Sequence, residues 1–332
     1  MFLLPQVYSS CRLLSSFFDR LMYPRATRFV SEIRLQGFYR DVAYLLASTW
    51  DYSFLLQYLL EQKSSETEHP MHTTQVNSRA KKLQEETVTY AGFHSIITGV
   101  NRSWEYGGFP LPDGTFWRYR EPNAVIVVEG ERMRATAKLS RANDQVQTLD
   151  NAKNMFFSTR RFEIPERGHI SFEWDMKALC SGTKPHDLYD GLVSVNLLDF
   201  STGVALDFFA CNDVIASVYA LLPFPGVPEP ADDENAVKPK YFCDFQELSL
   251  STAPGQQHRY RIRYHRAKDE VHFFVDGQEV GMYTEVPVKI NGFIIALGLM
   301  TEKQIEQGKS ISVRGQVLSG TWSTFTITTG AD

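Results

Sequence analysis

Short runs of alternating apolar and polar residues fill the chain from Val88 onward, and turn-forming residues separate them. Runs of this kind, repeated roughly every 8–12 residues, are typical of an all-β sandwich or barrel. Strands are predicted at Ala124–Val128, Met133–Ala137, Met155–Ile164, His169–Ala178, Leu192–Phe200, Val204–Ala210, Ile215–Leu222, His258–His265, Val271–Val275, Ile294–Met300 and Trp322–Thr328. So many strands with almost no helix favour a two-sheet antiparallel sandwich.

The first seventy residues have a different pattern. Six arginines and no lysine occur up to residue 40, among serines and apolar residues. Residues 38–62 carry apolar side chains at helical spacing, which predicts one amphipathic helix. Three interpretations stay open: a helical extension, a mitochondrial presequence, or an upstream start ahead of Met71. The predicted organisation is an extension over 1–70, a linker with the first strands over 71–115, and the sandwich over 116–330.

Composition narrows the classes of partner. The net charge is −5, so no basic field indicates a nucleic-acid partner. No apolar run reaches the roughly 18 residues of a membrane helix. The protein is expected in the cytoplasm, or in mitochondria if the start is a presequence.

Cofactor and metal signatures do not occur in the sequence. It carries neither a phosphate-binding loop nor a dinucleotide fingerprint, so no cofactor is predicted. Cys11, Cys180, Cys211 and Cys243 lack zinc-ligand spacing, so no metal site is predicted. Buried thiols are the first interpretation of these cysteines, and one disulfide, Cys180–Cys211 or Cys211–Cys243, is the alternative.

The hairpin over residues 258–280 reads HRYRIRYHRAKDEVHFFVDGQEV. It resembles a hairpin of concanavalin A-like lectins and glucanases, including glycoside hydrolase family 16. Residues 161–163 and 172–178 resemble a strand of the same superfamily, and the order of elements agrees. The resemblance covers residues 116–329 and implies a jelly-roll sandwich with its ligand on the concave face. The chain is also similar to a smaller family of unknown function, which implies no activity.

One strand departs from family 16, whose catalytic strand places two glutamates on the concave face with an aspartate between them. If Asp207 takes the place of that aspartate, the glutamate positions become Ala205 and Phe209. Shifted by one residue, they become Val204 and Phe208. Neither register supplies a carboxylate pair, so a retaining glycosidase of this kind is not expected.

Asp207 is the central candidate for a site, because a carboxylate in an apolar strand needs a ligand or a structural partner. Phe209 shares its face, and Asn196 and Ser194 on the preceding strand are expected to join it. Tyr219, on the following strand, completes the predicted ligand-binding set.

Three functions are open for this set of residues. The first is non-hydrolytic binding of a saccharide or of another small hydroxylated or aromatic molecule. The second is an enzyme, such as a lyase or cyclase, that uses Asp207 as a lone general acid or base. The third is a structural or interaction domain.

Arginines alternate along the hairpin at Arg259, Arg261 and Arg263, followed by His265. Glu270 and His272 are expected opposite them on the same face. Such a row is most often a solvated surface with pairs of opposite charge across the strands, and an anion site is the alternative.

Overall fold

The computed structural model describes residues 85–110, 115–140, 152–224, 227, 241–302, 305–306, 309–310 and 315–331. The predicted helix over 38–62 and the extension over 1–70 lie outside these residues. Within them, the only α-helix is α4 (His94–Thr98), and nearly all other regular structure is strand. β1 and β2 pair with later strands of the two sheets, so the sheets already include residues ahead of 116.

One antiparallel sheet, here the nine-stranded sheet, has the order β16-β15-β14-β9-β20-β6-β5 in the described part of the chain, with β21 beside β9 and β1 beside β21. Its strands are β1 (Glu86–Tyr90), β5 (Val125–Glu129), β6 (Arg132–Lys138), β9 (Gly168–Ser181), β14 (Gln257–His265), β15 (Glu270–Val275), β16 (Gln278–Tyr283), β20 (Val317–Ser323) and β21 (Phe325–Ala331).

The second sheet, here the eight-stranded sheet, has the order β13-β12-β11-β10-β17-β7-β2, with β8 beside β17. Its strands are β2 (Trp104–Tyr106), β7 (Lys153–Ser158), β8 (Phe162–Glu163), β10 (Leu192–Asp199), β11 (Val204–Ala210), β12 (Ile215–Leu221), β13 (Phe242–Glu247) and β17 (Gly292–Met300). The short elements are β3 (Gly108–Pro110), β4 (Phe116–Arg118), η1 (Leu188–Asp190), β18 (Ile305–Glu306) and β19 (Lys309–Ser310).

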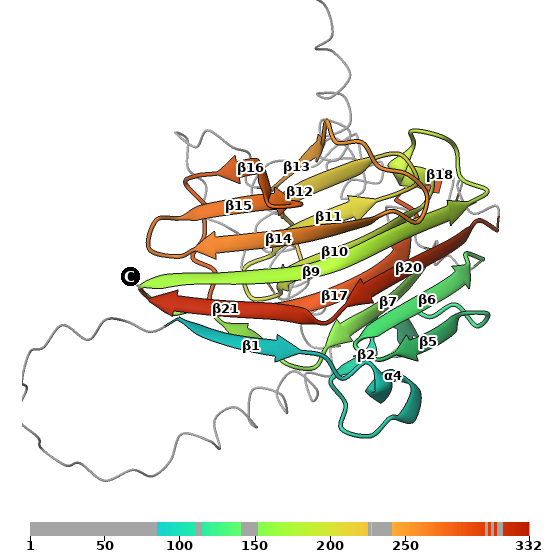
Figure 1. Ribbon diagram of the computed structural model, residues 1–332, viewed down its shortest axis with the longest axis horizontal. Coiled ribbons are helices and arrows are strands. Elements are labelled where there is room, and N and C mark those ends of the chain that lie inside the picture. Colours follow the sequence, from blue (N-terminus) through green and yellow to red (C-terminus); the bar gives the residue numbers. More distant parts are fainter. Residues whose placement is uncertain are drawn as a thin grey trace, which may run out of the picture. The chain divides into compact units, whose positions relative to one another are not determined.

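The two sheets pack face to face as layers (Figure 1), and aromatic side chains fill the space between them. Phe208 of β11 is fully buried, and its ring lies 5.0 Å from that of Tyr260 and 5.4 Å from that of Phe273. Both partners belong to the nine-stranded sheet, so this cluster joins the layers by apolar burial. The predicted all-β, two-sheet antiparallel sandwich is confirmed.

The hairpin of β14 and β15 forms as predicted. Tyr260 pairs with Val275 and Ile262 with Phe273, which places the apolar side chains on one face. After β15, Asp276 and Gly277 have φ angles of 51° and 82°, and β16 begins directly after them. Two consecutive positive φ values are the signature of a type I′ turn, which fits the twist of the flanking strands.

The single strand predicted at Met155–Ile164 is wrong. Residues 155–164 form two strands, β7 and β8, and both pair with β17 of the eight-stranded sheet. The following strand, β9, lies in the nine-stranded sheet, so the connection crosses between sheets and closes no hairpin. Ser158 ends β7 because its hydroxyl donates to the carbonyl oxygen of Arg160 (2.8 Å) and accepts from the backbone N–H of Ile295 (2.9 Å).

The predicted strand at 322–328 is also divided. β20 and β21 are separated at Thr324, and they pair with the two halves of the long strand β9.

Cys180, Cys211 and Cys243 are free thiols. In the part of the chain that the structure describes, no helix combines the length and the apolar character that a membrane crossing requires.

Candidate ligand-binding site

Alternation along β11 divides its side chains between the two faces of the eight-stranded sheet. Phe208 points at the nine-stranded sheet, as its ring contacts show. Ala205, Asp207 and Phe209 therefore lie on the opposite face, called here the outer face. Asp207 and Phe209 thus share one face of β11, as the sequence predicts.

The pairing of the strands places Asp207 in a straight row across the outer face. Directly paired residues of antiparallel strands point to the same side of the sheet. The row runs through β7, β17, β10, β11, β12 and β13, and is called here the Asp207 row; its members are Phe157, Ala296, Asn196, Asp207, Val218 and Phe245.

Asn196 and Ser194 lie where the sequence predicts them. Asn196 is directly opposite Asp207, and Ser194 is directly opposite Phe209. The amide nitrogen of Asn196 donates to the hydroxyl oxygen of Ser194 (2.9 Å) and to the carbonyl oxygen of Ala296 (3.2 Å). These two hydrogen bonds fix the amide group beside Asp207.

Tyr219 does not belong to this site, and that part of the prediction is wrong. It pairs with Leu206, whereas Asp207 pairs with Val218, so Tyr219 points to the interior of the sandwich. Its ring packs 4.8 Å from the ring of Tyr283 in the nine-stranded sheet. Asp207 and Tyr219 are thus on opposite faces of the same sheet.

Asp207 is buried, with 6% of its surface exposed. Its Oδ1 atom is also buried and has no hydrogen-bond partner among the described residues. Burial raises the pKa of this carboxyl well above its ordinary value, and the negative charge of Glu302 raises it further, while Lys153 opposes the shift. Glu302 and Lys153 form an ion pair of 3.0 Å. Asp207 is therefore a carboxyl group that favours its neutral, proton-bearing form.

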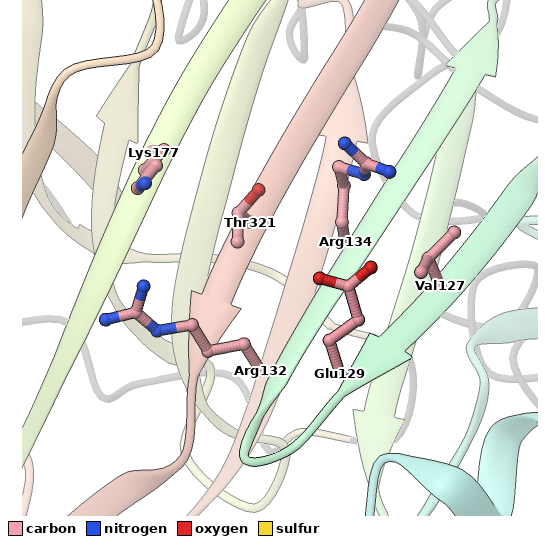
Figure 2. A pocket seen from close by; sticks show the side chains of 6 residues that line it. All are labelled: Val127, Glu129, Arg132, Arg134, Lys177 and Thr321. Carbon is pink, nitrogen blue, oxygen red and sulfur yellow. The ribbon is translucent and has the colours of Figure 1, made fainter.

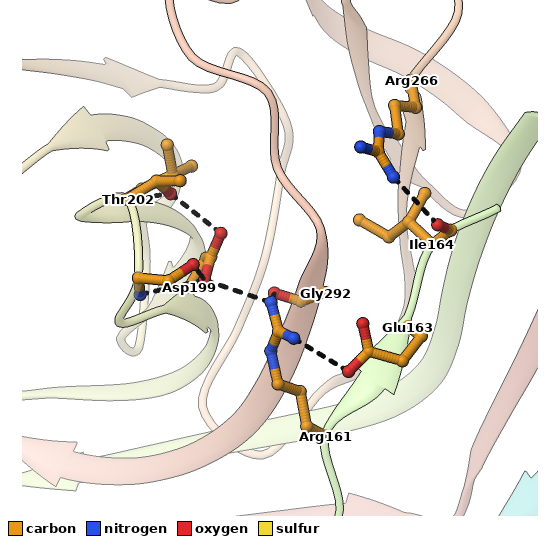
Figure 3. A network of polar contacts seen from close by, with 9 residues as sticks. Arg161, Glu163, Ile164, Asp199, Thr202, Arg266 and Gly292 are labelled. Carbon is orange, nitrogen blue, oxygen red and sulfur yellow. Dashed lines mark hydrogen bonds and ion pairs between the residues drawn. The ribbon is translucent and has the colours of Figure 1, made fainter. Parts of the chain in front are cut away.

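Asp199, eight positions earlier, shows how a structural carboxylate is satisfied in this fold. Its Oδ1 accepts from the backbone N–H of Ser201 (3.0 Å), and its Oδ2 accepts from the hydroxyl of Thr202 (2.9 Å). Arg161 lies 3.5 Å from Oδ1 (Figure 3). Both oxygens of Asp199 hold the turn between β10 and β11, whereas Oδ1 of Asp207 has no such role.

Aromatic clusters stand at both ends of the Asp207 row. At one end, the ring of Phe157 lies 6.1 Å from that of Phe200. At the other end, the ring of Phe245 lies 5.3 Å from that of Tyr189 and 6.4 Å from that of Phe209. Flat apolar surface therefore borders a polar centre on two sides.

Sequence reasoning missed Phe157 and Phe245, together with the ion pair of Lys153 and Glu302. Phe157 belongs to the apolar run Met155-Phe156-Phe157, which shows that one phenylalanine faces outward but not which residues it joins. The described residues bring together no group of three or more metal-ligating side chains.

Replacing Asp207 by asparagine is expected to stabilise the protein at neutral pH. The folded state holds the Asp207 proton at pH values where the unfolded chain, with its ordinary pKa of 3.8, has lost it. The folded state then binds more protons than the unfolded state, so the stability of the wild type falls as pH rises from 3.8 toward the raised pKa. The slope reaches about 1.4 kcal/mol per pH unit. Asp207→Asn removes this loss.

The measurement is urea unfolding of the wild type and Asp207→Asn between about pH 4.5 and about pH 7.5. The advantage of the variant should grow with pH. A destabilisation by about 3–5 kcal/mol would instead identify Asp207 as one partner of a buried ion pair.

The sequence profile of a family of unknown function, DUF6081, matches residues 91–331, which is most of the chain. The chain belongs to this family. The match begins just after β1 and includes all the strands that form the Asp207 row. A search of curated proteins gives no match.

Several solved structures are similar to this DUF6081 chain at low identity. The endo-1,3-beta-glucanase from Streptomyces sioyaensis is 12% identical, with a TM-score of 0.46 over 78% of this chain and 100% of that chain. The carbohydrate recognition domain of Emp47p is 12% identical, with a TM-score of 0.39 over 77% of this chain and 100% of that chain. A sialidase is 11% identical, with a TM-score of 0.40 over 68% of this chain, and the DUF6081 chain spans only 17% of its length.

Proposed function

We propose that the outer face of the eight-stranded sheet binds a small hydroxylated ligand, with a saccharide as the leading class, and does not hydrolyse it. Asp207 carries this proposal, because it presents a buried carboxyl oxygen that no described residue satisfies. A neutral carboxyl group donates one hydrogen bond and accepts others. It therefore matches a ligand hydroxyl, which also does both.

The side chains around Asp207 favour a flat, partly apolar ligand. Phe157 and Phe245 mark the two ends of the row, and their rings suit the apolar face of a sugar or an aromatic ring. Between them the strands carry small residues, among them Ala296 in the row and Ala205 beside it.

The side chains that flank Asp207 support the non-hydrolytic part of the proposal. A retaining glycosidase needs two carboxyl groups about 5–5.5 Å apart. The neighbours of Asp207 on its own strand and face are Ala205 and Phe209, and neither is an acid. Glu302 does influence Asp207, but it is held by Lys153 in an ion pair.

A glycan array and a thermal-shift screen of hydroxylated metabolites, both on the full chain, test the proposal. Asp207→Ala removes the carboxyl group and is expected to weaken binding of a hit by about tenfold or more, the effect of losing a hydrogen bond to a buried group. Tyr219→Phe is the matched control, since it removes only one hydroxyl from the other face of the sheet. Loss of binding in Tyr219→Phe but not in Asp207→Ala would overturn the proposal.

Incubation with mixed-linkage and laminarin-type glucans is expected to release no reducing ends. Release by the purified wild-type protein would contradict the non-hydrolytic part of the proposal.

An enzyme that transfers a proton is the second candidate, and the raised pKa of Asp207 favours it. A carboxyl group with a raised pKa keeps its proton to a higher pH than an ordinary one, and can serve as a general acid. Asp207→Asn separates the two functions, because asparagine keeps a donor and an acceptor but cannot deliver a proton. Retained binding with lost turnover of a hit would identify an enzyme, and equal behaviour of the two proteins would identify a binder.

A further inference from the structure

The solvent-facing side of the nine-stranded sheet carries a second row of polar residues, away from Asp207. Lys177 of β9 pairs with Thr321 of β20, and Thr321 pairs with Arg134 of β6. Arg134 in turn pairs with Val127 of β5. Direct pairing places these four side chains on one face, in what is called here the Thr321 row.

A shallow pocket of about 220 Å³ lies over the Thr321 row. Besides the four members of the row, Arg132 and Glu129 line it. Figure 2 shows Lys177, Thr321 and Arg134 following one another across three strands, with Arg132 extending toward β9. Three cationic side chains and one carboxylate therefore surround one hydroxyl group.

The acids near the pocket leave Lys177 and Arg134 without a counter-ion. Asp175, the nearest acid on β9, accepts from Arg259 (3.1 Å) and from the amide of Gln257 (2.9 Å). It also lies 3.9 Å from the half-exposed side chain of Arg132. In the part of the chain that the structure describes, neither Lys177 nor Arg134 forms an ion pair. The pocket therefore has an excess of positive charge.

The spacing of the row suits a tetrahedral oxyanion. Directly opposite Cβ atoms lie about 4.5–5.5 Å apart, so Lys177 and Arg134 stand about 10 Å apart with Thr321 midway. An anion on the Thr321 hydroxyl is within reach of the ammonium of Lys177 and of two guanidinium N–H groups of Arg134. A phosphate or sulfate group offers enough oxygens to accept all of these bonds.

We propose that the Thr321 row is a binding site for the phosphate or sulfate group of a small ligand, separate from the Asp207 row on the other sheet. The site needs no metal and no covalent step. Glu129 opposes the anion from one side of the pocket, because it is a carboxylate on the strand next to Arg134. This carboxylate keeps the site weak for a free inorganic ion.

Titration of the full chain with inorganic phosphate and with sulfate, at constant ionic strength, tests the site. The readouts are the melting temperature and the backbone amide resonances of the protein. In the wild type, both ions should shift the resonances of Thr321 and Arg134 and raise the melting temperature. The double variant Arg134→Gln with Lys177→Gln should weaken binding by about tenfold or more, since two charge-assisted hydrogen-bonding groups are lost.

Two single variants test the charge argument. Glu129→Gln removes the opposing carboxylate and should strengthen binding of both ions. Lys138→Gln is the matched control, because Lys138 is an exposed cation on the same strand and face as Arg134 but lies outside the pocket. Its removal should leave binding unchanged.

The proposal would be overturned by equal binding in the double variant and the wild type, or by an equal loss in Lys138→Gln. Either result would show that the ions act through general charge or through exclusion from the surface. Asp207→Ala should leave the titration unchanged, so this test succeeds or fails independently of the function proposed for the other sheet.

Discussion

Replacing Phe273 with alanine is expected to lower the free energy of unfolding by about 3–5 kcal/mol, the usual cost of truncating a buried phenylalanine. Phe273 is fully buried between the sheets. Its ring contacts Phe208 of the eight-stranded sheet at 5.4 Å and Tyr283 of β16 at 5.9 Å. Alanine would leave a cavity at the contact between the layers, which the surrounding strands cannot close without losing their hydrogen bonds.

Phe274→Ala is the matched control, since it makes the same change one residue later. Phe274 points to the other face of β15, where the guanidinium of Arg261 lies 4.0 Å from its ring. Its removal should cost about 1 kcal/mol, from the lost cation–π contact and partial burial. The measurement is urea unfolding of both variants. Equal losses would contradict the assignment of the two faces of β15.

Gly203→Ala is expected to destabilise the protein by about 3 kcal/mol, from backbone strain and overlap together. Gly203 precedes β11 with a φ of 86°, a conformation that costs a residue with a Cβ atom. That Cβ atom would also overlap the carbonyl oxygen of Leu222. The Leu222 backbone cannot withdraw freely, because its N–H donates to the carbonyl oxygen of Gly203 (2.8 Å).

Gly130→Ala separates the two costs. Gly130 also has a positive φ, 59°, but an added Cβ atom there meets nothing within 4 Å. The control should lose only the conformational part, about 1–2 kcal/mol. Thermal unfolding of the two variants measures the difference. Similar melting temperatures would show that Leu222 moves aside at little cost, and that the start of β11 is less tightly fixed than the structure indicates.

The sequence by itself determined the features that depend on neighbours along the chain. Strict alternation in residues 259–264 predicts which side chains of the hairpin face the core, and the Asp276-Gly277 pair predicts its tight turn. Alternation also places Asp207 and Phe209 on one face of β11 and shows that no glutamate accompanies them. A strand has a period of two, so these conclusions require no knowledge of the rest of the fold.

The pairing of distant strands was decided only by the tertiary structure. The run over residues 155–164 has the pattern of a strand before a turn, and the pattern is the same whether the next strand lies in the same sheet or in the other one. The chain ends β7 at Ser158, forms β8 beside β17, and then crosses to β9 in the nine-stranded sheet. That choice depends on which apolar faces meet across the core, and such contacts join residues far apart in the sequence.

The candidate site shows the same division between local and distant information. Asn196 lies opposite Asp207 across a short turn, so the sequence could predict their meeting. Tyr219 was misplaced because a difference of one residue in register moves a side chain to the other face, and the turn between β11 and β12 fixes that register. Burial and the charge of Glu302 raise the pKa of Asp207 and Lys153 opposes them, and only the folded chain brings these residues near Asp207. The residue types along β11 are known from the sequence alone. Desolvation and charge act through space, so their effect on the pKa of Asp207 is determined only by the tertiary structure.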